Sequence, residues 1–556
     1  MSTPTVSHLE ESNLPVRSQE SSQILDLPDE LLHLISNELD DESICRISIT
    51  CRRFHYLALP ILFERHDEYY HQEGFLVSYQ GKKETVPALK MALFVTQLQE
   101  IHFYLNHTVE RLFSELNHLR GLVSRLTSLK TAMISFSDVD VWLQEVLSDN
   151  GEESTLPTRP MIEVERWKEA FLGLMDAFLR ASCTRLSIQG GRRIFEVSQA
   201  MASDSIPAIP SPYDQLSMES LSLYPPAATF QEEINTSMPW DTSNKLNQAS
   251  SFYYERTRDR AMTSALVNFE IFSEILLEPL CFSWTLDALN ASANTLTHLA
   301  FKVENIPSTT WSHLFGSLSL NALESLNITC GLVIQEPHIT TESFFEFLAR
   351  HPTVTTLDLY GVSILEEGFL LPKGILPNIT TITAHPSYIV GIVRQQCDKS
   401  TPSLKSITVS SEYYTHRSFD YRLFDDALVS VTQLATDIEL GLKFAYEIGL
   451  DQWFLTHSSS TNPSIIRNLH HVQKLTIKVS WFIELSSTVF QIFPIWLSLF
   501  RNLSYLEFAE LPSESVERFT SMDNKHLLEE IAFRCPRLES ITLNHRTKLH
   551  MSSFRK

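Results

Sequence analysis

The sequence predicts an α/β protein in which a module of three short helices precedes a solenoid of short parallel strands that alternate with helices. Three observations support this prediction. Three amphipathic helical segments follow one another between residues 24 and 66. A short apolar pattern recurs from about residue 90 onward, and its clearer copies stand 25 to 37 residues apart. Amphipathic helical stretches lie between many of these copies, as strand–helix repeats require.

The chain starts with a polar segment, residues 1–22, which is rich in Ser and Glu and is expected to be a disordered tail. The three-helix module follows at residues 23–66. Pro28 suits the first helical position because that position needs no N–H, and acidic residues after it favour the positive end of the helix dipole. Three apolar residues then recur every four positions and share one helix face: Leu31, Ile35 and Leu39.

A polar break at residues 40–43 supplies acidic and capping residues for a second helix, whose apolar positions include Ile44 and Ile47. A third apolar segment follows Cys51. About forty residues bury too little surface to fold alone. The module therefore needs a neighbour, which is either the rest of the chain or a second protein.

The order LPxELLxxIxxxL, a polar break and IxxIxxxCRRFxxLAxPxLF resembles an F-box, over 43 of 556 residues. That family docks onto the Skp adaptor of Skp–cullin–F-box ubiquitin ligases. The resemblance implies an adaptor-binding surface of nine residues: Leu27, Pro28, Leu31, Leu32, Ile35, Leu39, Ile44, Cys51 and Phe54. Ile44 and Ile47 stand where the family more often has leucine. The alternative is an ordinary helical cap on a larger fold.

A connector at residues 67–89 leads into the repeats, which are assigned to residues 90–545. Their pattern, apolar-x-x-apolar-x-apolar, is seen in LESLNI at 323–328, VTTLDL at 354–359 and LKSITV at 404–409. Its apolar residues should be buried in one parallel ladder, among them Leu326, Leu357, Ile407, Leu475, Leu506 and Ile541. The spacing resembles the long, irregular leucine-rich repeats of many F-box proteins. The alternative is a set of buried strands in an ordinary α/β domain. A doubly wound sheet would also alternate strands and helices, but the glycine-rich turn expected after its first strand is absent.

Three stretches rich in proline and small polar residues interrupt the repeats, and we expect them to form loops. One is at residues 148–160, and the other two are within residues 202–251. Residues 546–556 are basic and are expected to be a frayed C-terminal tail.

The composition indicates a folded protein that avoids anionic partners. Hydrophobic residues make up 43% of the chain, and 67 acidic against 44 basic residues give a net charge of −23. This charge opposes non-specific binding to nucleic acid and to anionic membranes. Seven cysteines without CxxC spacing favour reduced thiols over disulfides or zinc. No apolar run is long enough for a signal peptide or a membrane span, so we expect a cytoplasmic or nuclear protein without cofactor or metal.

No motif for phosphate, dinucleotide, zinc-protease or nucleophilic-serine chemistry is present. We therefore expect a non-catalytic binding protein. The F-box resemblance implies the substrate-recognition adaptor of a Skp–cullin–F-box ligase, in which the repeats capture an unknown target protein. One alternative is a non-degradative F-box scaffold outside any cullin complex. Another is a repeat-only protein or an enzyme with a hidden site.

Between the buried positions of such a ladder, side chains face the concave side. The predicted central column is Ala300, Asn327, Asp358, Thr383, Thr408, Glu439, Thr476, Glu507 and Thr542. Its right-hand neighbours include Tyr360, His385 and Ser410, and Tyr505 flanks it on the left. Acidic residues are depleted in strands, so their presence here favours binding of a basic or hydrogen-bond-donating target. The candidates are Asp358, Tyr360, Asp437, Glu439, Tyr505 and Glu507. The alternative is that the loops at 202–251 or the C-terminal repeats select the target.

Overall fold

The computed structural model of the 556-residue chain describes residues 24–66, 88–89, 91–105, 109–137, 164–192, 194, 265–304, 306–330, 339–362, 371–397, 403–412, 419–434, 436–445, 447–459, 464–480, 486–511, 516–517 and 525–555. The chain divides into two compact units. One contains residues 1–70 and 82–94, and the other contains residues 71–81 and 95–556. The expected tail at 1–22 and the loops at 148–160 and 202–251 lie outside the described residues, as does most of the connector.

The first unit contains the three expected helices, α1 (Asp29–Asn37), α2 (Asp41–Ser48) and α3 (Arg52–Arg65), after a short 3-10 turn, η1 (Ile24–Asp26). Asp40 caps α2, because its side chain accepts a 2.7 Å hydrogen bond from the backbone N–H of Ser43. The core of the unit is apolar and centres on α3, with Leu59, Leu62 and Phe63 almost fully buried. The prediction of a three-helix module is confirmed.

The second unit is one sheet with helices between its strands. Its strands are β1 (Gln97–Tyr104), β2 (Ser128–Ser135), β3 (Arg185–Gln189), β4 (Asn268–Phe272), β5 (His298–Val303), β6 (Ser325–Cys330), β7 (Thr356–Tyr360), β8 (Thr381–Ala384), β9 (Ser406–Ser410), β10 (Ile438–Phe444), β11 (Val472–Val479), β12 (Tyr505–Ala509), β13 (Ser540–Leu543) and β14 (Thr547–His550). Its α-helices are α5 (Val109–Val123), α7 (Val164–Arg180), α10 (Pro279–Ala291), α11 (Ser308–Ser317), α12 (Thr341–Arg350), α13 (Pro386–Cys397), α14 (Arg422–Val431), α15 (Leu450–Ser458), α16 (Ser487–Leu497) and α18 (Lys525–Arg534). Short 3-10 turns are η3 (Glu274–Leu277), η4 (Ile465–Asn468) and η6 (Met551–Phe554).

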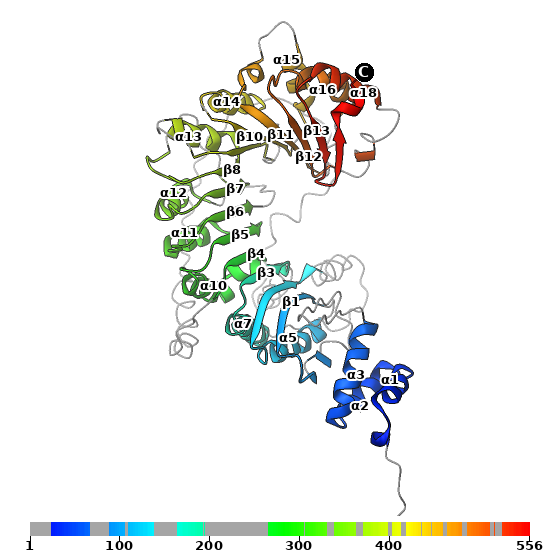
Figure 1. Cartoon of the computed structure of the whole chain (residues 1–556). Coiled ribbons are helices and arrows are strands. Elements are labelled where there is room, and N and C mark those ends of the chain that lie inside the picture. The colour runs from blue at the N-terminus through cyan, green and yellow to red at the C-terminus, as the bar shows by residue number, and fades with distance from the viewer. Residues whose placement is uncertain are drawn as a thin grey trace, which may run out of the picture. The chain divides into compact units, whose positions relative to one another are not determined.

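Within the described residues the sheet has 14 strands that follow one another in chain order. Each strand from β1 to β12 pairs in parallel with the next. In Figure 1, helices α10 to α13 stand on one side of strands β4 to β8. A doubly wound sheet would reverse its strand order and carry helices on both faces. The unit is therefore a leucine-rich-repeat-like solenoid, as predicted.

The repeated apolar residues form the ladder that the sequence predicts. Leu326 pairs with Leu357, and Leu475 pairs with Leu506, in the registers of adjacent strands. The six residues expected in the ladder are at most 1% exposed: Leu326, Leu357, Ile407, Leu475, Leu506 and Ile541. Because side chains alternate along a strand, the residues between them form a second face. We call this second face, which lies opposite to the ladder, the open face of the sheet.

The expectation of a frayed C-terminal tail is wrong. Residues Thr547–His550 form β14, which pairs antiparallel with β13 and continues the sheet. A 3-10 turn follows, and Met551 in this turn is fully buried. The sequence has no repeat motif here because β14 returns through a tight turn, so the spacing that identifies the parallel strands does not apply.

His351 and His385, in the repeat unit, are each only 1% exposed. His351 donates from Nδ1 to the carbonyl oxygen of Phe347 (2.6 Å), and its Nε2 accepts from the backbone N–H of Leu320 (2.8 Å). Burial lowers the pKa of His351 below its ordinary value, and the nearby Arg350 adds to this effect. Burial also lowers the pKa of His385 to about 3. Both side chains are therefore neutral in the folded chain near neutral pH.

We expect the free energy of unfolding to fall as the pH drops below about 6.5, the ordinary pKa of histidine. In that range the histidine is protonated in the unfolded chain and neutral in the folded chain. Each histidine therefore lowers the free energy of unfolding by about 1.4 kcal/mol per pH unit until the pH reaches its pKa in the folded chain. Glu278 opposes this trend, since burial raises its pKa to about 7. Urea unfolding of wild type and His385→Gln at pH 7.5, 6.5 and 5.5 isolates one histidine. Equal pH slopes in the two proteins would contradict the assignment.

Candidate functional site

A group of apolar side chains on α1 is exposed to solvent. Leu31, Leu34 and Ile35 keep 45%, 60% and 39% of their surface exposed. Leu34 and Ile35 follow Leu31 by three and four positions, so both lie on the same side of the helix as Leu31. Pro28, just before the helix, is exposed as well. An exposed cluster of apolar side chains is a candidate interaction surface. We call these four residues the α1 face.

The other residues expected to bind an adaptor are buried or half-buried. Leu32 and Ile44 are fully buried and Phe54 is 7% exposed, so they support the α1 face from within the unit. Leu27, Leu39 and Cys51 are half-buried. Leu32, Ile44 and Phe54 lie beneath the exposed surface, because a buried side chain cannot touch a partner directly, and adaptor binding by the nine residues stays a prediction.

One exposed member of the α1 face, Leu34, was missed by the sequence analysis. The family pattern leaves its position unspecified, although its spacing of three from Leu31 was a usable signal. Leu39 was expected on the same helix face as Leu31 and Ile35. The helix ends at Asn37, so Leu39 lies beyond it.

The second candidate surface is the open face of the sheet, whose central column differs from the predicted one at β10. Thr408 pairs with Gly441, not with Glu439, and Gly441 pairs in turn with Thr476. Glu439 lies one column to the left, between Ser406 and Lys474. The strand reads IELGLKF, with apolar residues at every second position. A shift of two residues leaves each side chain on the same face, so the apolar pattern alone does not set this register.

Gly441 is required at its place in the central column. A Cβ atom there would lie 2.2 Å from Oγ1 of Thr408 on the neighbouring strand. The Thr408 side chain therefore occupies the space that a larger residue would need.

The acidic residues on the open face are paired within the sheet. The ammonium group of Lys474 lies 3.1 Å from Oε2 of Glu439 and 4.0 Å from Oε2 of Glu507. Glu507 also contacts the ring of His545. Asp437, just before β10, accepts a 3.0 Å hydrogen bond from Gln473. The acidic surface that the sequence predicted is thus partly neutralised by a lysine from the intervening strand.

Asp358 and Tyr360 lie beside two lysines. Burial raises the pKa of Asp358, while Lys443 and Lys478 oppose that shift. The ammonium nitrogen of Lys443 is 5.0 Å from the centre of the Tyr360 ring, a cation–π contact. Lys478 pairs with Glu510 at 3.6 Å. This part of the open face offers both signs of charge and one aromatic ring.

Three further members of the open-face columns differ in accessibility. Tyr505 is 44% exposed and donates to Oε2 of Glu539 at 2.8 Å, and this bond raises the pKa of Tyr505. His385 and Ser410 were expected to face the target, but they are at most 1% exposed. A target cannot reach such buried side chains, and the ring of His385 lies against that of Phe419, with 5.9 Å between the ring centres.

Residues 24–68 match the model of the F-box-like family. They form an F-box-like domain. The match includes α1, α2 and α3 and therefore the α1 face. The chain is also similar in structure to the leucine-rich repeat-containing protein LegL7 from Legionella pneumophila, at 12% identity and a TM-score of 0.33. That similarity covers 56% of this chain and 93% of that chain. No curated protein matches the sequence.

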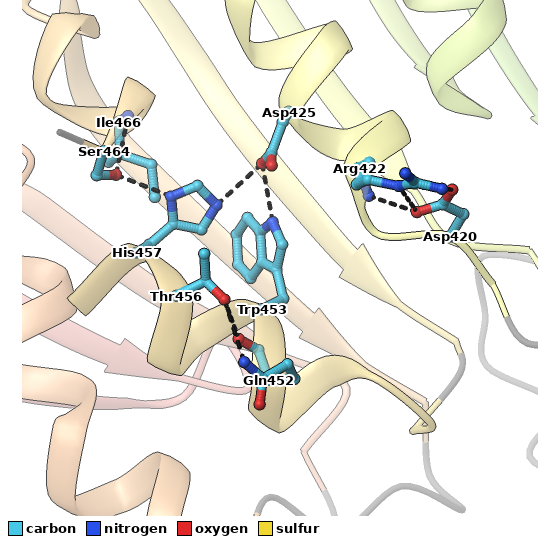
Figure 2. Close-up of polar contacts among 9 residues, drawn as sticks. All are labelled: Asp420, Arg422, Asp425, Gln452, Trp453, Thr456, His457, Ser464 and Ile466. Carbon is cyan, nitrogen blue, oxygen red and sulfur yellow. Dashed lines mark hydrogen bonds and ion pairs between the residues drawn. The ribbon is translucent and has the colours of Figure 1, made fainter. Parts of the chain in front are cut away.

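Outside the F-box-like domain, Figure 2 shows a chain of polar contacts that joins α14, α15 and η4. Nε1 of Trp453 and Nε2 of His457 each lie 2.9 Å from Oδ1 of Asp425. Nδ1 of His457 lies 2.9 Å from Oγ of Ser464. An Asp, a His and a Ser in this order are also the groups of a nucleophilic triad.

The geometry around Ser464 indicates a structural role for this chain. Ser464 is 7% exposed, and its Oγ accepts a hydrogen bond from the backbone N–H of Ile466 as the cap of η4. The polar atoms of this chain thus form hydrogen bonds with one another within the helical layer, as buried polar groups require.

In the described part of the chain no helix is long and apolar enough to cross a membrane. The same residues hold no group of three or more His, Cys, Asp or Glu placed to bind a metal ion.

Proposed function

We propose that this protein is the substrate-recognition subunit of a Skp–cullin–F-box ubiquitin ligase. The F-box-like domain docks a Skp-type adaptor, and the open face of the repeat unit captures a target protein. The observation that supports docking most strongly is the α1 face, in which apolar side chains of a small domain remain exposed on one side of a helix.

In this role the chain performs no chemical step of its own. Its two surfaces lie on one polypeptide, so binding both partners raises the effective concentration of a target lysine near the ubiquitin-conjugating enzyme. The many parallel strands of the solenoid suit this task because they present a long binding surface.

Co-purification of the full-length chain with a purified Skp-type adaptor and a cullin tests the proposal. We expect both to be retained, the cullin only when the adaptor is present. Retention of the adaptor without the cullin would indicate a non-degradative scaffold and would contradict the role in a ligase. Absence of adaptor binding would overturn the proposal.

Target capture is expected to depend on the open face. Charge reversal at Asp358, Glu439 and Glu507 removes the acidic groups and leaves Lys474 unpaired. Proximity labelling under proteasome inhibition identifies the proteins enriched by the wild-type chain. We expect their enrichment to fall by about 30-fold in the triple variant, as for loss of a contact of hot-spot strength. Glu346→Lys is the matched control, since Glu346 is exposed on helix α12. If the enriched set survives the triple reversal and disappears on deletion of residues 224–251, the open face does not select the target.

A further inference from the structure

Helix α1 carries the exposed docking face, yet it contributes little to the core of the F-box-like domain. Its buried residues are Leu32 and Ser36. Helix α3, in contrast, buries residues along most of its length, from Phe54 to Phe63. A helix of nine residues is not stable by itself in water. The position of α1 therefore depends on tertiary contacts, and its two buried side chains supply only part of them.

An arginine near the start of α3 holds the start of α1. The guanidinium group of Arg53 donates to the carbonyl oxygen of Leu27 at 2.7 Å. It also pairs with the carboxylate of Asp29, with its Nη2 at 2.6 Å and its Nε at 2.8 Å from Oδ1. Leu27 and Asp29 flank Pro28 of the α1 face, so this contact fixes the point at which the chain enters the helix.

An arginine in the last turn of α3 holds the other end of α1. Nη1 of Arg65 donates to the carbonyl oxygen of Leu39 at 2.6 Å and lies 3.2 Å from Oδ1 of Asp41. Nη2 donates to the carbonyl oxygens of Ser36, at 3.5 Å, and of Asn37. The last carbonyl groups of a helix have no partner within the helix, and the planar guanidinium fork serves several of them at once.

We propose that Arg53 and Arg65 are positioning residues that keep α1 docked on α3, so that the α1 face is presented to its partner. The identity of that partner, a Skp-type adaptor, rests on the proposed function. The two arginines act through α1. If α1 is docked for a fraction of the time, the apparent dissociation constant of the adaptor rises by the inverse of that fraction.

The test uses the full-length chain with Arg53→Met or Arg65→Met, which keep an apolar stem and remove the guanidinium group. The matched control is Arg46→Met, because Arg46 is 75% exposed and pairs with Glu42 on its own helix. Hydrogen exchange of the free chain reports on docking of α1, and titration with purified adaptor gives the dissociation constant. We expect about tenfold faster exchange of the α1 amides and about tenfold weaker adaptor binding in both variants.

Three further readings separate positioning from general destabilisation. Exchange of the α3 amides stays at the wild-type rate, Arg46→Met behaves as wild type, and saturating adaptor restores slow exchange in α1. Faster exchange without weaker binding would overturn the proposal, as would weaker binding without faster exchange, which indicates direct contact with the adaptor. If a methionine variant also loses protection in α3, the lysine variant at the same position, Arg53→Lys or Arg65→Lys, which keeps one donor group, replaces it in both measurements. If wild type does not bind the adaptor, the proposed function fails, while exchange in the free chain still shows whether the arginines hold α1.

Discussion

Leu357→Asp is expected to unfold the middle of the repeat unit. Leu357 is 1% exposed and lies between Leu326 and Ile382 on the neighbouring strands. A carboxylate at this position is surrounded by apolar side chains and has no partner. Such a burial costs about 4 kcal/mol or more, a large part of the stability of an ordinary domain. Because each repeat contacts mainly its neighbours, the loss should be greatest around β6 to β8.

Thr356→Asp is the matched control for this prediction. Thr356 precedes Leu357 in the same strand, but it faces the open side and is half-exposed. We expect its free energy of unfolding to change by less than about 1 kcal/mol. Thermal unfolding and limited proteolysis compare the two variants. Equal stability of the two would contradict the placement of the repeat motif in the core.

Leu31→Ala combined with Ile35→Ala is expected to weaken adaptor binding by about a thousandfold. Both side chains are exposed on the α1 face, so their truncation removes contacts to the partner and leaves the core intact. Anchor residues of this type contribute about 2 kcal/mol each to binding, which corresponds to about 30-fold per residue. Titration of the full-length chain with purified Skp-type adaptor measures the change.

His33→Ala provides the control on the same helix. His33 is exposed, and its ring contacts Asn37 along α1 at 3.2 Å, away from the α1 face. We expect adaptor affinity within about twofold of wild type, as is usual for a surface substitution outside an interface. Wild-type affinity in the Leu31→Ala, Ile35→Ala protein would show that another surface binds the adaptor.

Local chemistry along the chain determined the fold class. Asp40 caps α2 by accepting a hydrogen bond from the backbone N–H of Ser43, three residues away, so nearby residues in the sequence determine where that helix starts. The apolar positions of each repeat motif likewise lie within six residues. Because the motif recurs along the chain, Leu326 and Leu357 are buried in one ladder. Such features are predictable because every group involved lies within one or two turns or strands.

The tertiary structure decided the features that depend on residues distant in sequence. The register of β10 is set by its neighbours, because apolar alternation is unchanged by a shift of two residues. Lys474 neutralises Glu439 from 35 residues away, so the charge of the open face follows from strand pairing and not from composition. Arg65 likewise holds the end of α1 across 26 residues to Leu39. Which apolar residues of α1 are buried, Leu32 and not Leu34, follows from where α3 packs against it.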